Sequence, residues 1–332
     1  MVQKVSEDPD IRMLDVHMPT SNPKIIHVYV LQSQGESLVV DTGMDWPQGR
    51  QDLEEGLKEL ALDFSHTKLF LTHSHSDHTG LSKLFTDRGC SVYMGKREIE
   101  YYRWYIGDEV FHDVLQLSYE MGVPVEKLSK AAGSTQKMSQ ISPSGLPVDY
   151  PVIGLEDGDT LQIGDLQLRT ILSPGHTAGH MMLYLPERKV LFTGDHVLKG
   201  VTPIMDTPVF SKNPLKDYLE SLENLKDLPV DLVLPGHGEL GWNFYERLGE
   251  LIDVHQEELN CILSVLQGQP AQTAWEIVQA VRKMRGKYPW EKMPFIQQVL
   301  AAQEITPHLE YLQEEGKLVA QKDGVALRYS LS

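Results

Sequence analysis

The stretch of the chain best equipped for chemistry is a six-residue segment that begins at His73 and reads His-Ser-His-Ser-Asp-His. It holds three imidazoles, those of His73, His75 and His78, together with the carboxylate of Asp77. Neutral imidazole nitrogens and carboxylate oxygens are ligands that suit zinc, iron or manganese. A lone histidine is more often a surface residue or a satisfied core residue, but four such groups within six positions indicate a metal site.

The residues before this segment determine how its side chains are presented. Lys68–Thr72 is a short apolar run of strand length, so the cluster lies just beyond a predicted strand, where the backbone turns into a loop. From such a loop His73 and His75 can point toward one centre, while Asp77 and His78 serve a second centre nearby. The spacing therefore suits two metal ions.

Three later segments extend this pattern. They read Ser-Pro-Gly-His-Thr-Ala-Gly-His over Ser173–His180, Phe-Thr-Gly-Asp-His over Phe192–His196 and Leu-Pro-Gly-His-Gly over Leu234–Gly238. Together with the segment at His73, they resemble the ordered sequence motifs of the metallo-β-lactamase superfamily. The resemblance extends over residues 25–240, and several motifs in the right order are far more specific than any one of them.

The resemblance implies a dinuclear metal centre with seven protein ligands. It assigns His73, His75 and His176 to the first site. It assigns Asp77, His78 and His237 to the second site, and Asp195 to both as a bridging ligand. Two divalent ions are expected, with zinc as the first choice and iron or manganese as alternatives. A hydroxide between the ions would attack the substrate, with Asp77 orienting it or passing on a proton, so Asp77 and Asp195 are the expected catalytic residues.

Three further residues are expected to support the ligands. Asp41 ends a predicted strand, and in the superfamily an aspartate at such a strand end is commonly a buried support of the metal loop. From the residues alone, Asp41 followed by Thr and Gly is equally compatible with an ordinary turn. His180 and His196 each lie close in sequence to an expected ligand, and we predict that they orient ligands or line the pocket.

Strands and helices alternate around these motifs, which is typical of a layered α/β fold. Gln48–Ala61 carries apolar residues on one helical face and predicts an amphipathic helix, and another helix is expected over Gly80–Arg88. Strands are predicted at Ile25–Leu31, Ser37–Asp41, Ser91–Met94, Thr160–Ile163, Leu166–Leu172, Met181–Leu185, Val190–Thr193 and Asp231–Leu234. The resemblance implies the four-layer αββα fold of the superfamily, with a helical insertion and a C-terminal winged-helix-like domain.

The predicted insertion covers about residues 96–150. Helices are expected at Arg97–Gly107, Glu109–Met121 and Val125–Ala132, before a Ser/Pro/Gly-rich segment at Ser139–Pro147. A dense aromatic group lies within the insertion and consists of Tyr101, Tyr102, Trp104, Tyr105 and Phe111. It could pack the core of the inserted helices, or it could form an apolar lid or substrate pocket beside the metals.

We place the domain boundary after Trp242, with a catalytic domain over residues 1–242 and a second domain over 243–332. Helices predicted at Asn243–Leu266, Thr273–Arg285 and Phe295–Glu315 precede a hairpin formed by Lys317–Ala320 and Ala326–Leu331, an order that resembles a winged helix. The segment expected to read DNA, Pro307–Glu315, has three glutamates and neither Arg nor Lys. A packing, dimerisation or site-covering role is therefore favoured over DNA binding, and His255, His308 and Asp253 are expected to be ordinary helix residues.

The overall charge argues against nucleic acids as partners. The chain has 332 residues, with 47 acidic against 30 basic side chains and a formal net charge of −17, and phosphate binding depends on clustered Lys and Arg. It contains two cysteines and no apolar run long enough to span a bilayer, so a cytoplasmic protein without a membrane segment is expected. A homodimer is left open.

Several activities agree with these residues. The favoured hypothesis is a metal-dependent hydrolase of an ester-type bond in a small molecule, a thioester or a lactone. The alternatives are an endoribonuclease or phosphodiesterase of the same superfamily, in which one branch also carries a winged-helix-like end, a mononuclear iron dioxygenase, and a non-catalytic metal-binding sensor. Asp195 argues against β-lactam hydrolysis as the main activity, and His75 argues against the flavodiiron redox branch.

Overall fold

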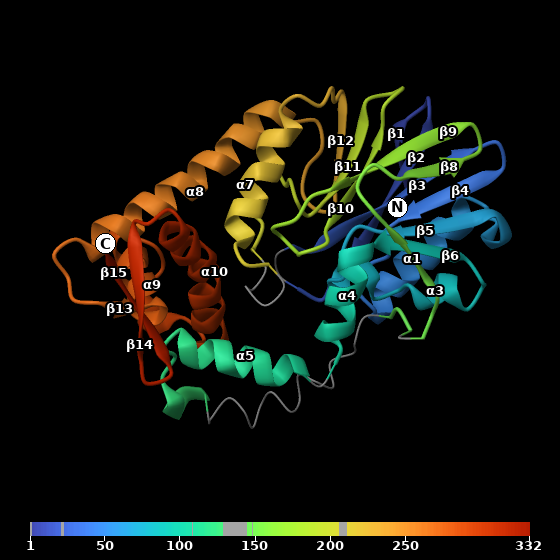
Figure 1. Cartoon of the computed structure of the whole chain (residues 1–332). Helices are drawn as coiled ribbons and strands as arrows, with labels where there is room; N and C mark the ends of the chain where they lie inside the picture. Colours follow the sequence, from blue (N-terminus) through green and yellow to red (C-terminus); the bar gives the residue numbers. More distant parts are fainter. Residues whose placement is uncertain (1, 21–22, 108, 129–144, 148, 206–210) are drawn as a thin grey trace. The chain divides into compact units, whose positions relative to one another are not determined.

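The structure is a computed structural model that describes residues 2–20, 23–107, 109–128, 145–147, 149–205 and 211–332 (Figure 1). It divides into two compact units. The first contains residues 1–103, 142–203 and 224–248, and the second contains residues 104–141, 204–223 and 249–332. Helix α8 (Phe244–Leu266) runs from the first unit into the second. The domain boundary after Trp242 remains a prediction.

A seven-stranded sheet forms one half of the first unit, with the strands in sequence order from β1 to β7. Its strands are β1 (Val2–Ser6), β2 (Asp10–His17), β3 (Ile25–Ser33), β4 (Glu36–Val40), β5 (Thr67–Leu71), β6 (Ser91–Gly95) and β7 (Val152–Leu155). Strands β1 to β4 are antiparallel, whereas β4 to β7 are parallel. The predicted hairpin between β3 and β4 is confirmed, and Gln34 and Gly35 both have positive φ angles, as tight hairpin turns require.

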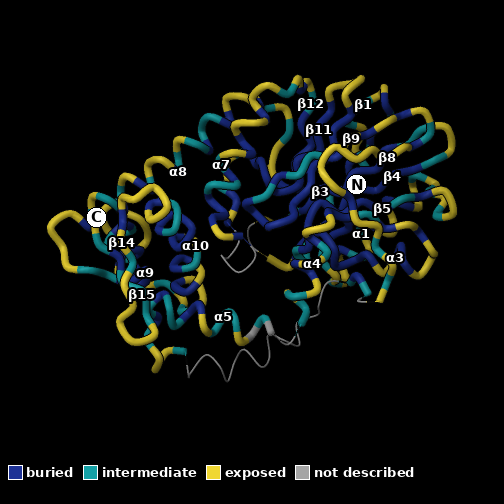
Figure 2. Tube along the Cα trace, viewed as in Figure 1, coloured by how far each residue is buried: buried dark blue, intermediate teal, exposed yellow. Residues whose placement is uncertain are grey.

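The second sheet has five strands in the order β12-β11-β10-β9-β8. They are β8 (Thr160–Ile163), β9 (Leu166–Leu172), β10 (Met181–Leu185), β11 (Val190–Gly194) and β12 (Leu232–Pro235), which agree with the predicted strands to within one residue. Only the β11–β12 pair is parallel. Figure 2 shows the strands of both sheets running through mostly buried positions, with exposed positions gathered at the turns.

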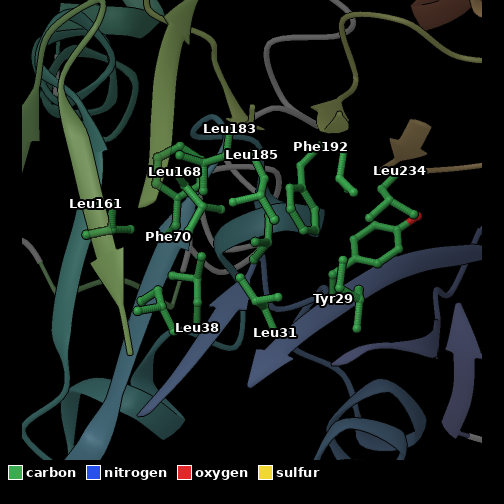
Figure 3. Packing of buried hydrophobic residues seen from close by; sticks show 14 of the residues in the cluster. Tyr29, Leu31, Leu38, Phe70, Leu161, Leu168, Leu183, Leu185, Phe192 and Leu234 are labelled. Atoms are coloured by element: carbon green, nitrogen blue, oxygen red, sulfur yellow. The ribbon is translucent and has the colours of Figure 1, made fainter. Parts of the chain in front are cut away.

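The main core lies where the two sheets face one another (Figure 3). Tyr29, Leu31, Leu38 and Phe70 come from the first sheet, and they meet apolar side chains of the second sheet, namely Leu161, Leu168, Leu183, Leu185, Phe192 and Leu234. Each fully buried side chain of this size contributes about 1.5–3 kcal/mol through the hydrophobic effect. This apolar contact holds together the strand ends from which the motif residues project.

Helices cover the first sheet on its other face. Because successive strand residues point to opposite faces, Ile11 and Met13 join the core between the sheets, while Leu14 points toward α1 (Pro47–Glu59). A Cβ atom at Gly56 would lie 1.7 Å from Leu14 Cδ2, so any other residue at this position would have to displace the Leu14 side chain. The predicted amphipathic helix is thus confirmed.

The helix predicted over Gly80–Arg88 is wrong in extent. The structure has only two single turns here, α2 (Ser76–Thr79) and α3 (Lys83–Thr86). The Leu81 amide donates to the Gly43 carbonyl oxygen at 3.0 Å instead of to a helical carbonyl, which interrupts the helix. Helix α4 (Lys96–Tyr105) then follows β6 without a linker.

The second unit is mainly helical. It contains α5 (Glu109–Glu120), most of α7 (Pro214–Leu225) and of α8, α9 (Ala274–Met284), α10 (Phe295–Glu314), and a small sheet of β13 (Gln272–Thr273), β14 (Leu318–Asp323) and β15 (Ala326–Leu331) in the order β13-β15-β14. Thr273 and Glu276 form a capping box that starts α9. The C-terminal helices and hairpin agree with the sequence prediction, while the winged-helix interpretation stays a prediction.

His255 and His308 are more than ordinary helix residues, because the structure buries both and joins them. His308 Nδ1 lies 3.1 Å from the Glu304 carbonyl oxygen, and His308 Nε2 lies 3.0 Å from His255 Nδ1. If His308 Nδ1 carries the proton, its Nε2 accepts from His255 Nδ1, so both rings can be neutral. Burial lowers the pKa of His255 to about 3 and that of His308 to about 4.

Two members of the aromatic group pack in the first unit. Tyr101 and Tyr102 are buried, and the Tyr102 hydroxyl donates to the Leu146 carbonyl oxygen at 2.6 Å. Tyr105 is 41% exposed, so the group is not uniformly a core. The lid hypothesis stays untested, and most of the segment predicted at Ser139–Pro147, like the end of the helix predicted from Val125, lies outside the described residues. None of the described helices combines the length and apolar character needed to cross a membrane.

Candidate metal centre

The loop that follows β5 is held by Asp41, which directly follows β4. Asp41 is buried and has a φ of 62°, a conformation that Asp tolerates better than most residues. Its carboxylate accepts from the Thr72 amide at 2.9 Å, from the Thr72 hydroxyl at 2.9 Å and from His78 Nδ1 at 2.8 Å. The carboxylate therefore fixes both the start of the loop and the orientation of one expected ligand.

The first group of expected ligands contains three histidines from two loops. His73 Nε2 lies 3.0 Å from His75 Nδ1 and 3.2 Å from His176 Nε2. Burial lowers the pKa of His73 and brings the pKa of His75 to about 3, so these rings are neutral at physiological pH. Neutral nitrogens that converge at this distance are arranged to share one cation.

The second group contains Asp77, His78 and His237. His237 Nε2 lies 3.3 Å from Asp77 Oδ2, and His237 Nδ1 donates to the Ile25 carbonyl oxygen at 2.7 Å. His78 Nδ1 is engaged by Asp41 in the same way. Both histidines thus keep Nε2 directed into the group, which is how an outer hydrogen bond sets the tautomer of a metal ligand.

Asp195 lies between the two groups. It follows β11, and its Oδ1 is 3.4 Å from His78 Nε2 while its Oδ2 is 3.5 Å from His237 Nε2. It also forms a potential metal-binding set with His73 and His78, so it reaches toward the first group as well. The structure therefore brings all seven sequence-predicted ligands into one cluster.

The second group carries charge even without metal. Burial alone would lower the pKa of His78, but the carboxylates of Asp41, Asp195 and Asp77 raise it above its usual value. Burial alone would raise the pKa of Asp77, but His78 and His237 bring it down to about 2. Imidazoles and carboxylates of this group thus favour one another's charged forms.

The donor atoms fit metal ions. His78 Nε2, Asp195 Oδ1 and His237 Nε2 are buried and have no hydrogen-bond partner within the described part of the chain. An unsatisfied buried polar atom costs about 1–3 kcal/mol, so three that converge on one place need an explanation. Ligands about 2.1 Å from a tetrahedral ion are about 3.4 Å apart, close to the 3.0–3.5 Å separations measured here.

His180 and His196 are close to the cluster but belong to none of the ligand groups in the described residues. The Asp195 amide lies 3.3 Å from His180 Nε2, which accepts from it, and His180 Nδ1 lies 2.8 Å from Ser173 Oγ. His180 therefore contacts the backbone of the expected bridging residue. His196 is buried, and its ring centroid lies 5.5 Å from that of His180.

The loop that carries His237 is tied to the first sheet. The His27 amide donates to the Gly236 carbonyl oxygen at 2.8 Å, and the Tyr29 hydroxyl donates to the Pro235 carbonyl oxygen at 2.8 Å. His27 Nε2 also lies 2.7 Å from the Gly238 carbonyl oxygen. Residues after a strand of the second sheet are thus held by β3 of the first.

Glu98 is a residue near the centre that the sequence did not reveal. It lies in the first turn of α4, is fully buried, and accepts hydrogen bonds from both loops that carry the first group. A glutamate in a first helical turn is common because it complements the helix dipole, so its sequence position gave no signal. Its partners are 24 to 81 residues away in the chain.

Comparisons with known proteins agree with this arrangement. The family model of the metallo-beta-lactamase superfamily matches residues 21–237. The crystal structure of the metallo-beta-lactamase family protein TTHA1429 from Thermus thermophilus is 31% identical, with a TM-score of 0.80 over 97% of this chain and 98% of that one.

Two curated relatives are more distant. The beta-lactamase-like protein 2 homolog of Caenorhabditis elegans is 25% identical over 77% of this chain and 70% of its own length. The atrochrysone carboxyl ACP thioesterase of Emericella nidulans is 25% identical over 91% of this chain and 79% of its own length.

Proposed function

Because the chain belongs to the metallo-beta-lactamase superfamily, a family of metal-dependent hydrolases, we propose that it hydrolyses an ester-type bond, with a thioester first and a lactone second. The observation that carries the proposal is the position of Asp195, which forms a potential metal-binding set with His73 of the first group and faces His78 and His237 of the second. Such a carboxylate suits a pair of ions that share one substrate.

Seven side chains would hold two divalent ions, with zinc as the proposed metal. The first ion would be held by His73, His75 and His176, the second by Asp77, His78 and His237, and Asp195 would serve both. When bound, such ions supply Lewis acidity and lower the pKa of water from 15.7 toward about 7.

The chain's own residues would order the reaction around these ions. Asp77 is the more accessible of the two ligand carboxylates, with 19% of its side chain exposed against 12% for Asp195. It is therefore the better placed to orient the attacking water and to pass a proton to the leaving group. The buried histidines exclude bulk solvent from the other sides, which strengthens electrostatic interactions in the site.

Two observations support a thioester substrate. One relative that matches most of the chain is a thioesterase by name. In addition, the net charge of −17 opposes the close approach of RNA, whose binding relies on neutralising phosphates. A small acyl compound carries no such requirement.

The proposal is tested by assaying the metal-loaded protein on simple thioesters, lactones and single-stranded RNA side by side. Thioester turnover that His73→Ala abolishes and that His66→Ala leaves intact would support it, since His66 is 63% exposed and outside the cluster. Metal analysis of the same samples should give close to two ions per chain. RNA cleavage without turnover of any acyl substrate, or metal content that stays at or below one ion, would contradict it.

A further inference from the structure

We propose that Glu98 is a positioning residue that holds together the two loops carrying the first three histidines, and that it thereby sets metal affinity in that half of the centre. The inference rests on the metal site proposed above, but not on the identity of the substrate. Glu98 contacts neither substrate nor metal; it acts through the residues next to the ligands.

The hydrogen bonds of Glu98 reach both loops at once. Its Oε1 accepts from the Ser74 amide at 2.7 Å, and Ser74 lies between His73 and His75. Its Oε2 accepts from the Thr177 hydroxyl at 2.7 Å and from the Gly179 amide at 3.0 Å, and Thr177 follows His176 directly. One carboxylate therefore links positions adjacent to all three histidines of the first group.

The backbone is built to allow this link. A Cβ atom at Gly179 would lie 2.1 Å from the Glu98 amide nitrogen, and one at Gly95 would lie 2.4 Å from the Gly179 carbonyl oxygen. Because β6 ends at Gly95 and α4 begins at Lys96, the first turn of the helix is set directly against the second loop. Glycine at both positions permits an approach that any side chain would prevent.

The charge of Glu98 also suits a cation site. Burial raises the pKa of Glu98, while the hydrogen bonds from Ser74, Thr177 and Gly179 oppose that shift. An ion held by three neutral histidines keeps its full positive charge, and a buried carboxylate one residue beyond those ligands offsets part of it.

An amide at position 98 cannot make all the hydrogen bonds that the carboxylate of Glu98 makes. In Glu98→Gln one acceptor oxygen becomes an NH₂ group, so either the Ser74 amide or the Gly179 amide faces a donor instead of an acceptor. We expect this variant to bind the first-site ion roughly 10- to 100-fold more weakly. Thr177→Val removes only one hydrogen bond and keeps the carboxylate, so a loss of roughly 2- to 10-fold is expected.

Cobalt titration of the full chain tests the inference. Metal-free protein is titrated with Co²⁺, the visible absorption bands report ligand geometry, and elemental analysis gives the stoichiometry. We expect Glu98→Gln to weaken one of two binding steps and to alter its bands. Asp41→Asn should weaken mainly the other step, because Asp41 contacts His78 directly and reaches His73 only through the Thr72 hydroxyl. Glu310→Gln is the matched control, because it makes the same change at another partly buried glutamate, whose pKa burial raises to about 8. Glu310 belongs to the second unit, whereas the expected ligands belong to the first.

The outcomes separate this inference from the proposed function. Two unchanged cobalt steps in both Glu98→Gln and Thr177→Val, or equal weakening of both steps, would overturn the positioning role whatever the substrate. Selective weakening of one step in a protein that hydrolyses no acyl compound would support the role of Glu98 and remove the proposed substrate class. If Glu98→Gln does not fold, Thr177→Val alone decides the question by the same criterion.

Discussion

The two halves of the proposed metal centre are supported in different ways. The first consists of three histidines whose loops are joined from outside by Glu98. The second contains a carboxylate and histidines whose Nδ1 atoms are fixed by Asp41 and by the Ile25 carbonyl oxygen. One half therefore depends on a helix that lies outside every motif, whereas the other is supported by Ile25 in β3 and by Asp41 directly after β4. Removing supports one at a time should reveal this difference.

The largest effect is expected from Asp195→Ala, because Asp195 would serve both halves of the proposed centre. Loss of several kcal/mol of charge stabilisation with this ligand predicts a fall in kcat/KM of roughly 10³-fold or more. Asp87→Ala is the control, since the Asp87 side chain is 55% exposed and forms an ion pair with Lys83 on the surface. Equal activity of the Asp195 variant and the parent in thioester hydrolysis would remove the shared-ligand mechanism.

Truncation after Trp242 should impair the segment that follows Asp195. The buried Arg247 side chain donates to the Leu198 carbonyl oxygen at 2.7 Å and to the Val201 carbonyl oxygen at 2.7 Å, all within the first unit. Deleting residues 243–332 removes the donors to both carbonyls, of which that of Leu198 is buried, so a less stable and less active protein is expected. Thermal unfolding and metal analysis are the measurements. A truncated protein that was fully active and metal-loaded would show that the predicted domain over 243–332 is independent.

Asp41→Ala should have a smaller effect than Asp195→Ala. It releases Thr72 and His78 but removes no ligand, and the loss of such outer support typically costs about 10- to 100-fold in activity or metal affinity. Steady-state kinetics of both variants under saturating metal will rank them. A loss for Asp41→Ala as large as that for Asp195→Ala would mean that the second half collapses without its support.

The smallest effect on activity is expected from a pair of neutral histidines outside the proposed metal centre, which instead make stability depend on pH. With folded pKa values of about 3 and about 4, below the ordinary 6.5, His255 and His308 bind fewer protons when folded than when unfolded. Their contribution to the free energy of unfolding is fully present above pH 6.5. It is lost as the pH falls toward 4, at about 1.4 kcal/mol per pH unit for each histidine.

Denaturant unfolding of the second unit between pH 7 and pH 5 measures this slope. The slope of unfolding free energy against pH gives the number of protons taken up on unfolding. This number should be lower by up to two in the double variant H255L/H308L than in the parent. An identical slope in the two proteins would show that these rings are not held neutral by burial, and would weaken the same argument for His73 and His75.

The expected ligands could be picked out from the sequence because they stand in compact motifs directly after strands. Short apolar runs such as Leu166–Leu172 were predicted with their observed bounds, since strand patterning is local. Glu98 was not, because its function arises only when segments distant in sequence come together. The strands β1 and β2 were also missed; in β2 both Met13 and Leu14 are buried, which obscures the alternation that marks a strand. The role of Glu98 and the strands β1 and β2 depend on tertiary contacts, which a local sequence pattern does not show.

The ties between β3 and the loop of His237 have a consequence for folding. Four expected ligands follow β5 in the first sheet, while His176, Asp195 and His237 follow strands of the second, so each bound ion would join both sheets. An ion that binds only the folded state stabilises the folded arrangement of both sheets, because its ligands come from both. The two sheets should then open and close as one cooperative unit in the presence of metal. Amide hydrogens of β5 and β11 should exchange at a common, slow rate when metal is bound, and at separate, faster rates after chelation.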